Sequence, residues 1–190
     1  MSGNLYRVST KTASCKTTKY EGSSSLTFGM GFVANVGDAG DGGGGETLFV
    51  SKDEMSGDGV LATIDTETFV LTTIGAYSPT VQEAELTGTG GGQLYAFQPS
   101  IEGETTGSFI YEIDPTNATV IAGDPLPGIS AGDGWAFGFW GGDFYTFTAP
   151  APKDTTVVNK FDPKTKAITV VATSSDIIVG AGVSTCAPQD

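Results

Sequence analysis

The sequence has no histidine among its 190 residues, only two cysteines, and few charged side chains (16%). The absence of histidine excludes Ser-His-Asp and Cys-His catalysis and most zinc and copper sites. No stretch approaches the roughly 18 apolar residues of a membrane-spanning helix, so we expect no membrane span. Positive charge is also scarce, since nine Lys and Arg face 22 Asp and Glu, for a net charge of −13. Such an acidic surface repels phosphate backbones and anionic lipids, and we expect no nucleic-acid partner.

Glycine, by contrast, is abundant at 28 residues. The apolar runs are short and end at Gly, Pro, Asp or Asn, which favours strands and tight turns over helices. Residues 84–97 (AELTGTGGGQLYAF) recur fifty residues later as residues 134–147 (GWAFGFWGGDFYTF), and shorter copies lie at 26–31 and 178–182. Repetition of a β-rich unit at a period of roughly 40–60 residues is typical of β-propeller blades.

Each repeat is interpreted as four strands. The first carries a Gly-x-Gly core, which would let backbones approach closely at the propeller axis. The third ends at Asp65, Asp114 or Asp162, which we predict to be turn formers, because Asp before Thr or Pro is turn chemistry. Residues 3–20 match the last two strands of a repeat, and residues 177–190 match the first two.

The sequence therefore predicts an all-β fold, a four-bladed β-propeller of four-stranded antiparallel blades in a single domain, residues 1–190. The blades are expected at about 26–79, 80–130 and 131–176, with the fourth formed by 177–190 plus 3–20. Strands from the two chain ends would then share one blade and close the ring, which leaves no open sheet edge.

Both cysteines, Cys15 and Cys186, fall in that closing blade, and we predict a disulfide between them that ties the chain ends together. The alternative is two free thiols in a cytosolic protein. The opening residues MSGNLYRV do not form a signal peptide. Because disulfides persist in oxidising compartments, we expect an extracellular or cell-envelope protein whose leader is absent from this chain. We also expect a monomer.

Three acids and two tryptophans are candidate ligand-binding residues. Glu83 and Glu85 precede the first strand of the second repeat, and Asp133 has the place in the third that corresponds to Glu83. Paired acids at a propeller mouth could serve as general acid and base, or bind a cation or a sugar. The alternative is a buried Glu85 bonded to backbone amides beside two solvated acids. Trp135 and Trp140 could stack on a sugar ring or a partner's side chain, or fill the core between blades.

The acidic insertion after the first strand is the candidate metal site. Asp38, Asp41 and Glu46 offer the oxygen ligands that calcium prefers. Their spacing is not that of an EF-hand, because Ala39, Gly40 and the polyglycine run depart from the pattern. The alternative is an acidic surface loop that binds no metal. Calcium is the one cofactor that the residues suggest.

The segments AELTGTGGGQLYAF, GWAFGFWGGDFYTFTAP and IVGAGVSTCAP resemble those of uncharacterised secreted bacterial β-propeller-like repeat proteins. The resemblance covers nearly the whole chain and implies a propeller in the envelope or outside the cell. It supplies no catalytic residues. The ending Cys186-Ala187-Pro188 supports the disulfide.

We accordingly expect a protein that is not an enzyme but a non-catalytic binding or scaffolding propeller, whose partner is an unknown protein or glycan. Two alternatives stay open. One is a lectin-like glycan binder, assisted by calcium, and the other is a hydrolase that uses Glu83, Glu85 and Asp133.

Overall fold

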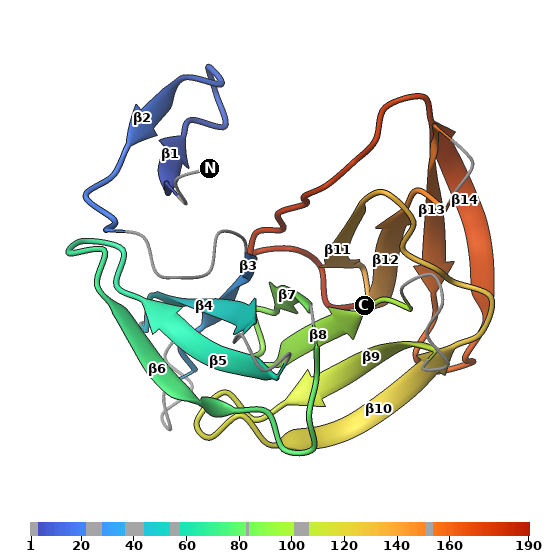
Figure 1. Cartoon of the computed structure of the whole chain (residues 1–190), viewed down its shortest axis with the longest axis horizontal. Helices are drawn as coiled ribbons and strands as arrows, with labels where there is room; N and C mark the ends of the chain where they lie inside the picture. Colours follow the sequence, from blue (N-terminus) through green and yellow to red (C-terminus); the bar gives the residue numbers. More distant parts are fainter. Residues whose placement is uncertain are drawn as a thin grey trace.

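The structure is a computed structural model that describes residues 4–21, 28–36, 44–53, 58–82, 84–100, 107–150 and 154–190. Fourteen strands in the described residues form four antiparallel sheets around a common centre (Figure 1). Three of the sheets have four strands and one has two. The all-β four-bladed propeller expected from the sequence is confirmed.

In each of the three complete blades, the four strands follow one another from the innermost to the outermost in the same order as in the sequence. Blade 1 comprises β3 (Phe28–Ala34), β4 (Glu46–Asp53), β5 (Gly59–Ile64) and β6 (Leu71–Ala76). Blade 2 comprises β7 (Glu85–Gly88), β8 (Leu94–Gln98), β9 (Ser108–Ile113) and β10 (Val120–Leu126). Blade 3 comprises β11 (Trp135–Trp140), β12 (Asp143–Thr148), β13 (Thr156–Phe161) and β14 (Ile168–Ser174). The fourth sheet is the hairpin of β1 (Tyr6–Val8) and β2 (Cys15–Thr17).

The innermost strands β3, β7 and β11 pack side by side at the centre. A Cβ built on Gly29 would lie 2.2 Å from the carbonyl oxygen of Ala84, and one built on Gly88 would lie 2.1 Å from that of Phe32. Only glycine permits this approach of neighbouring backbones, so the predicted reason for the Gly-x-Gly cores is confirmed in β3 and β7. It does not hold for the last repeat, because a Cβ on Gly180 or Gly182 would meet nothing within 4 Å. Because Gly29 faces Glu85 while Gly31 faces Thr87, β3 and β7 run parallel.

Apolar side chains fill the spaces between the blades and make the core. The cluster between blades 1 and 2 includes Leu61, Leu86 and Ile113, all at most 1% exposed. The cluster between blades 2 and 3 is largely aromatic, with Phe97 and Phe137 rings 5.6 Å apart. Large side chains from adjacent sheets thus interdigitate in these two wedges, which buries both faces of blade 2.

One turn is repeated at every hairpin between a third and a fourth strand. In blades 1, 2 and 3, Asp65, Asp114 and Asp162 each accept backbone N–H bonds from the residues that follow. Hydrogen bonds to these carboxylates favour the ionised form and lower the pKa of all three aspartates. The largest cause is the side-chain bond from Thr116 at Asp114 and from Thr165 at Asp162. At Asp65 the largest cause is the backbone bond from Thr68. Their predicted role as turn formers is confirmed.

The closing blade differs from the expectation. Residues 177–190 form no strand, and in the described part of the chain β1 pairs only with β2. The chain from Ile177 to Val183 nevertheless takes the inner-strand position, because Gly134 and Gly138 of blade 3 face the side chains of Ile177, Val179 and Val183. The predicted closure by paired terminal strands is therefore wrong in detail. Without a second strand between this segment and β1, the two chain ends have no common ladder.

Candidate functional site

Glu85 is the most unusual ionisable residue in the described structure. It begins β7 and lies directly opposite Phe97 on β8, so the two side chains project to the same face of blade 2. Phe97 belongs to the aromatic cluster between blades 2 and 3, which places the Glu85 carboxyl at that apolar interface. Burial there raises the pKa of Glu85 from 4.5 to about 7.

No residue in the described ranges donates a hydrogen bond to this carboxyl, and desolvation is the sole cause of its shift. The predicted alternative, a Glu85 anchored by backbone amides, is therefore not what the structure shows. A carboxyl that holds its proton near neutral pH and has no partner within the described chain is suited to donate that proton to a ligand.

Trp135 is brought to the same interface from the other side. It begins β11 and packs against the aromatic cluster together with Phe137 and Phe139, as strand alternation predicted. Its indole is only half-buried. Blades 2 and 3 thus place a partly exposed aromatic ring and a carboxyl of raised pKa at one wedge, near the starts of their inner strands.

Asp133 lies just before Trp135 and is exposed. Its backbone N–H donates to the carbonyl of Ala149, which fixes the chain entering β11 (2.9 Å). Its carboxyl therefore lies at the solvent-facing start of the strand, not in the apolar wedge. Glu83, the third acid of the predicted set, lies outside the described residues.

Trp140 is separated from this group. It ends β11, five residues beyond Trp135, which corresponds to about 16 Å along an extended strand. Its side chain is 53% exposed. The neighbouring Gly141 and Gly142 have φ of 61° and 78° and make the tight turn into β12. Trp135 and Trp140 therefore cannot contact the same small ligand.

Glu46, one of the three candidate calcium ligands, lies at the opposite end of the inner strands. Glu46 begins β4 and pairs with Ala34 at the end of β3, whereas Glu85 is level with Gly29 near its start. The Glu46 carboxylate accepts a hydrogen bond from the Thr185 hydroxyl. Asp38 and Asp41 lie outside the described residues. Within those residues, no group of three acids, cysteines or histidines could hold a metal ion.

The predicted disulfide is not formed. Cys15 and Cys186 are both free and exposed. Cys15 lies on β2, the outermost strand of the hairpin, whereas Cys186 follows the segment in the innermost position. Strands are about 4.8 Å apart, and a disulfide needs Cα atoms within about 7 Å, so two positions that far apart in one blade cannot be bridged. The argument for an oxidising compartment loses this support.

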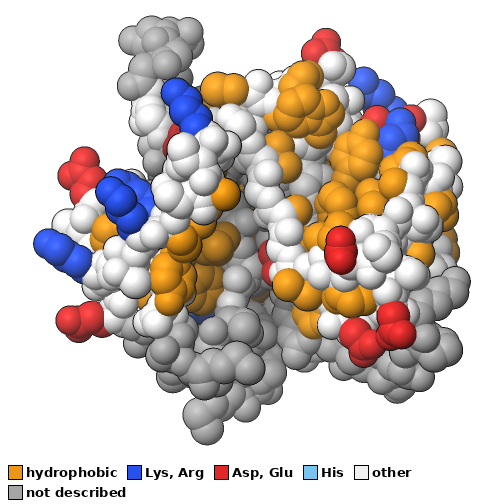
Figure 2. Space-filling view, turned by 90° about the horizontal axis from the view of Figure 1, so that it is seen from above, with side chains coloured by type: hydrophobic (Ala, Val, Ile, Leu, Met, Phe, Trp, Pro, Cys, Tyr) orange, Lys and Arg blue, Asp and Glu red, His pale blue; other side chains and the backbone are white. Residues whose placement is uncertain are grey.

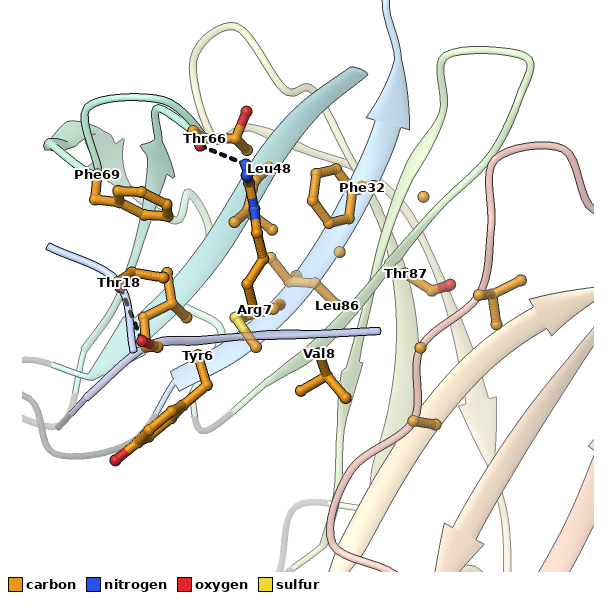
Figure 3. Close-up of a pocket in the computed structure, with 17 residues that line it drawn as sticks. Tyr6, Arg7, Val8, Thr18, Phe32, Leu48, Thr66, Phe69, Leu86 and Thr87 are labelled. Atoms are coloured by element: carbon orange, nitrogen blue, oxygen red, sulfur yellow. Dashed lines mark hydrogen bonds between the residues drawn. The ribbon is translucent and has the colours of Figure 1, made fainter. Parts of the chain in front are cut away.

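A cavity of about 430 Å³ was not predicted from the sequence. It lies between the N-terminal hairpin, the inner strands β3 and β7, and residues Ala181–Val183. Its walls are largely apolar, and hydrophobic side chains are visible in a hollow near the middle of the face shown in Figure 2. Arg7 crosses it, donating to the Thr66 carbonyl (2.9 Å) with its guanidinium 5.9 Å from the Phe69 ring (Figure 3). The available signal was the apolar character of Leu5, Tyr6 and Val8 around Arg7.

No helix in the described part of the chain is long and apolar enough to span a membrane.

Comparison with known proteins adds evidence on the fold. No protein family and no curated protein matches the sequence. Among solved structures, the chain is similar to a glycoside hydrolase family 43 arabinoxylan arabinofuranohydrolase from Bacillus subtilis, crystallised with cellotetraose, with a TM-score of 0.53 and 11% identity. The match covers 76% of this chain and 35% of that one. That enzyme is also a propeller, so the resemblance noted in the sequence is supported as to fold.

The expectation that the protein is not an enzyme is corrected by this comparison, because the chain shares its fold with a glycoside hydrolase. The expectation relied on the missing histidine. Glycoside hydrolysis is generally carried out by two carboxyl groups, one of which donates a proton while the other acts as base or nucleophile. The absence of histidine therefore does not exclude this chemistry.

Proposed function

We propose that this propeller binds a glycan at the wedge between blades 2 and 3 and hydrolyses it, with Glu85 as the proton donor. The observation that carries the proposal is the Glu85 carboxyl, whose pKa is raised to about 7 in an apolar wedge. A glycosidic oxygen needs a proton as its bond breaks, and a carboxylic acid protonated near neutral pH supplies it. The likeness to the family 43 enzyme supports the same reaction class.

Trp135 has the complementary role in this proposal. Its half-buried indole at the start of β11 offers a flat apolar surface on which a sugar ring can stack while its N–H stays available for hydrogen bonding. Asp133, exposed beside it, and Glu83 are the candidates for the second carboxyl. Replacing Asp133 and Glu83 one at a time tests which of them is the base or nucleophile, because loss of that residue should abolish turnover.

The test is Glu85→Gln, which keeps the side chain's shape and removes its acid function. Purified wild type and variant are incubated with arabinoxylan, cellulose-derived oligosaccharides and a panel of other polysaccharides, and released reducing sugar is measured. We expect the variant to lose about 100-fold or more in kcat, the usual contribution of a general acid, while it retains binding. Glu112→Gln on β9 makes the same chemical change in the same blade and is the matched control.

The pH profile gives a second readout. Because the acid must be protonated, the wild-type rate should fall as pH rises through about 7, the pKa of Glu85. A Glu85→Gln protein that turns over at the wild-type rate would show that Glu85 is not the acid. A wild type that neither binds nor cleaves any glycan in the panel would remove the proposal itself.

A second glycan contact is favoured by Trp140, whose exposed indole lies beside the Gly141-Gly142 turn. Trp140→Ala should weaken binding to long glycans without changing kcat on short ones, since its end of β11 lies away from Glu85.

Calcium binding by Asp38, Asp41 and Glu46 is a separate proposal, tested by repeating the binding assay with a chelator. A location outside the cell, where a polysaccharide substrate such as arabinoxylan is found, belongs to the same proposal. The monomeric state expected from the sequence stays a prediction.

A further inference from the structure

The fourth blade lacks one strand position in the described chain. In the complete blades, the strand next to the innermost one is β4, β8 or β12. In the fourth, residues Ile177–Val183 lie in the innermost position and β1 and β2 match the third and fourth strands. The match of β1 is structural as well as sequential, because Ser9 makes the turn bonds that the aspartates make elsewhere, accepting from the backbone N–H groups of Lys11 and Thr12 at 3.3 Å.

The 430 Å³ cavity lies where that strand would be. Leu5–Val8 line one side of it and Ala181–Val183 the other, while Met30, Phe32 and Leu86 line it from the inner strands. Met30 and Phe32 are 41% and 36% exposed, although the corresponding inner-strand positions of blades 2 and 3 are buried. An apolar slot with a strand on one side and an extended segment on the other has the shape of a missing strand.

Within the described residues, no strand pairs with the edge of β1 that faces away from β2. Leu5 and Ser9 exchange backbone bonds with the second half of the hairpin, since Thr18 donates to the Leu5 carbonyl and Ser9 donates to that of Ser14. In an antiparallel pair these bonds alternate, so the backbone groups of Tyr6 and Val8 point the other way. The Tyr6 and Val8 side chains are 47% and 59% exposed, and they lie on the opposite side of β1 from Arg7 (Figure 3).

We propose that an extended strand of a partner polypeptide inserts into this slot, pairs antiparallel with the free edge of β1, and completes the fourth blade. This is β-strand addition, in which backbone hydrogen bonds supply affinity and alternate side-chain pockets supply specificity. The proposal is independent of the glycan chemistry at Glu85, because the slot lies on the blade 4 side of the axis and Glu85 on the side of blades 2 and 3.

The chain itself indicates the chemistry of the partner strand. The second strands β4, β8 and β12 combine aromatic and aliphatic residues (ETLFVSKD, LYAFQ and DFYTFT). The basic residues near β1 indicate which charge the partner strand should carry at its first residue. Arg7 has the position that Lys160 has in blade 3, two residues before the turn-forming residue, and Lys160 forms an ion pair with Asp143 at the start of β12 (2.8 Å). Residues 4–20 contain Arg7 and three lysines and no acid. An apolar strand that begins with an acidic residue is therefore the best fit.

The probe is a fluorescently labelled peptide with the sequence of residues 142–150, GDFYTFTAP, titrated with the full chain and followed by anisotropy. We expect saturable binding by wild type and at least about tenfold weaker binding to Val8→Pro, which removes one free edge donor. Val8→Thr keeps the N–H and the β-branched shape and should bind like wild type. A peptide beginning GKFYTFTAP should bind more weakly, because its lysine faces Arg7.

Two further measurements cover other outcomes. Hydrogen exchange on the wild type should show the Tyr6 and Val8 amides protected by the peptide, which tests the pairing even if Val8→Pro does not fold. Sedimentation of the chain alone tests a second copy as occupant. No binding of the peptide, equal binding by Val8→Pro and wild type, or a dimer that protects these same amides would each overturn the proposal.

Discussion

At the scale of single residues, Glu85 illustrates why a buried acid in a strand is informative. A carboxyl at this place costs stability when it is ionised, because the apolar wedge does not replace its hydration and no described donor compensates. The neighbouring positions are apolar, because Leu86 follows Glu85 in β7 and Phe97 lies opposite it on β8. This cost is the reason that we propose a functional role for Glu85.

This cost predicts a pH-dependent effect of Glu85→Gln on stability. The pKa of Glu85 is raised from 4.5 in the unfolded chain to about 7 in the fold, so the folded state binds more protons between these pH values. Its contribution to stability is thus fully present below pH 4.5 and is lost as pH rises through 7. Above that pH the Gln variant should be more stable than wild type by up to about 3 kcal/mol. Urea unfolding at pH 4.5, 6 and 8 measures the difference.

At pH 4.5 the two proteins should unfold at similar urea concentrations, because a protonated Glu and a Gln differ little in charge. Glu112→Gln serves again as control and should show no such growth of the difference with pH. A constant difference between wild type and Glu85→Gln at all three pH values would contradict the buried, raised-pKa carboxyl.

At the scale of elements, one turn recurs in all four blades. After each third strand the first turn residue accepts a backbone bond from the residue four positions on, which has a positive φ: 52° at Ala13, 62° at Phe69, 64° at Ala118 and 61° at Lys166. Three turns use Asp for the side-chain bonds, and the fourth uses Ser9. The sequence offset of 56 residues between Ser9 and Asp65 therefore corresponds to a real structural equivalence.

Ser9→Asp should strengthen the N-terminal hairpin. The carboxylate would accept the Lys11 and Thr12 amides in charged hydrogen bonds, where the Ser hydroxyl now accepts both at 3.3 Å. Lys11 and Lys16 nearby add favourable charge. We expect slower hydrogen exchange of the β1 and β2 amides by up to about fivefold, equivalent to about 1 kcal/mol. Ser14→Asp, outside the cap position, is the control, and faster exchange in Ser9→Asp would contradict the equivalence.

Strands and turns could be predicted from the sequence where the residues that form them contact each other within one repeat. The repeat pattern predicts a second strand over residues 94–98, which coincides with β8, and the turn aspartates are where their chemistry required. The sequence pattern also predicts that the fourth strands begin at Phe69, Ala118 and Ala167. These residues belong to turns, because β6, β10 and β14 begin one or two residues later. A local pattern of apolar residues does not reveal that a turn needs one more residue in the left-handed region.

At the scale of the whole molecule, closure was the feature that sequence could not settle. Residues 178–182 repeat the inner-strand pattern and do take the inner position, yet they form no ladder, because a strand exists only when another strand pairs with it. The disulfide prediction depended on the same closure. For the site, sequence identified Glu85 and Trp135 as candidates, but their common interface follows from packing between blades and is not visible in spacing along the chain.

The N-terminal hairpin should be required for the stability of blade 1. Leu5 and Tyr20 pack on a cluster that contains Leu48, Val50 and Ile64, and Tyr20 is only 8% exposed. Removal of residues 4–20 would uncover this face and leave the outer side of β3 to solvent, where an exposed apolar sheet face promotes association. We expect a lower urea midpoint and concentration-dependent aggregation.

Two substitutions serve as controls for this truncation. Leu5→Ala, which removes one contact and keeps the hairpin, should lower the urea midpoint less. Val8→Thr, at an exposed position, should lower it hardly at all. A truncated chain that melts with the midpoint and cooperativity of the full chain would show that the hairpin is an appendage, and three blades alone would then be the stable unit.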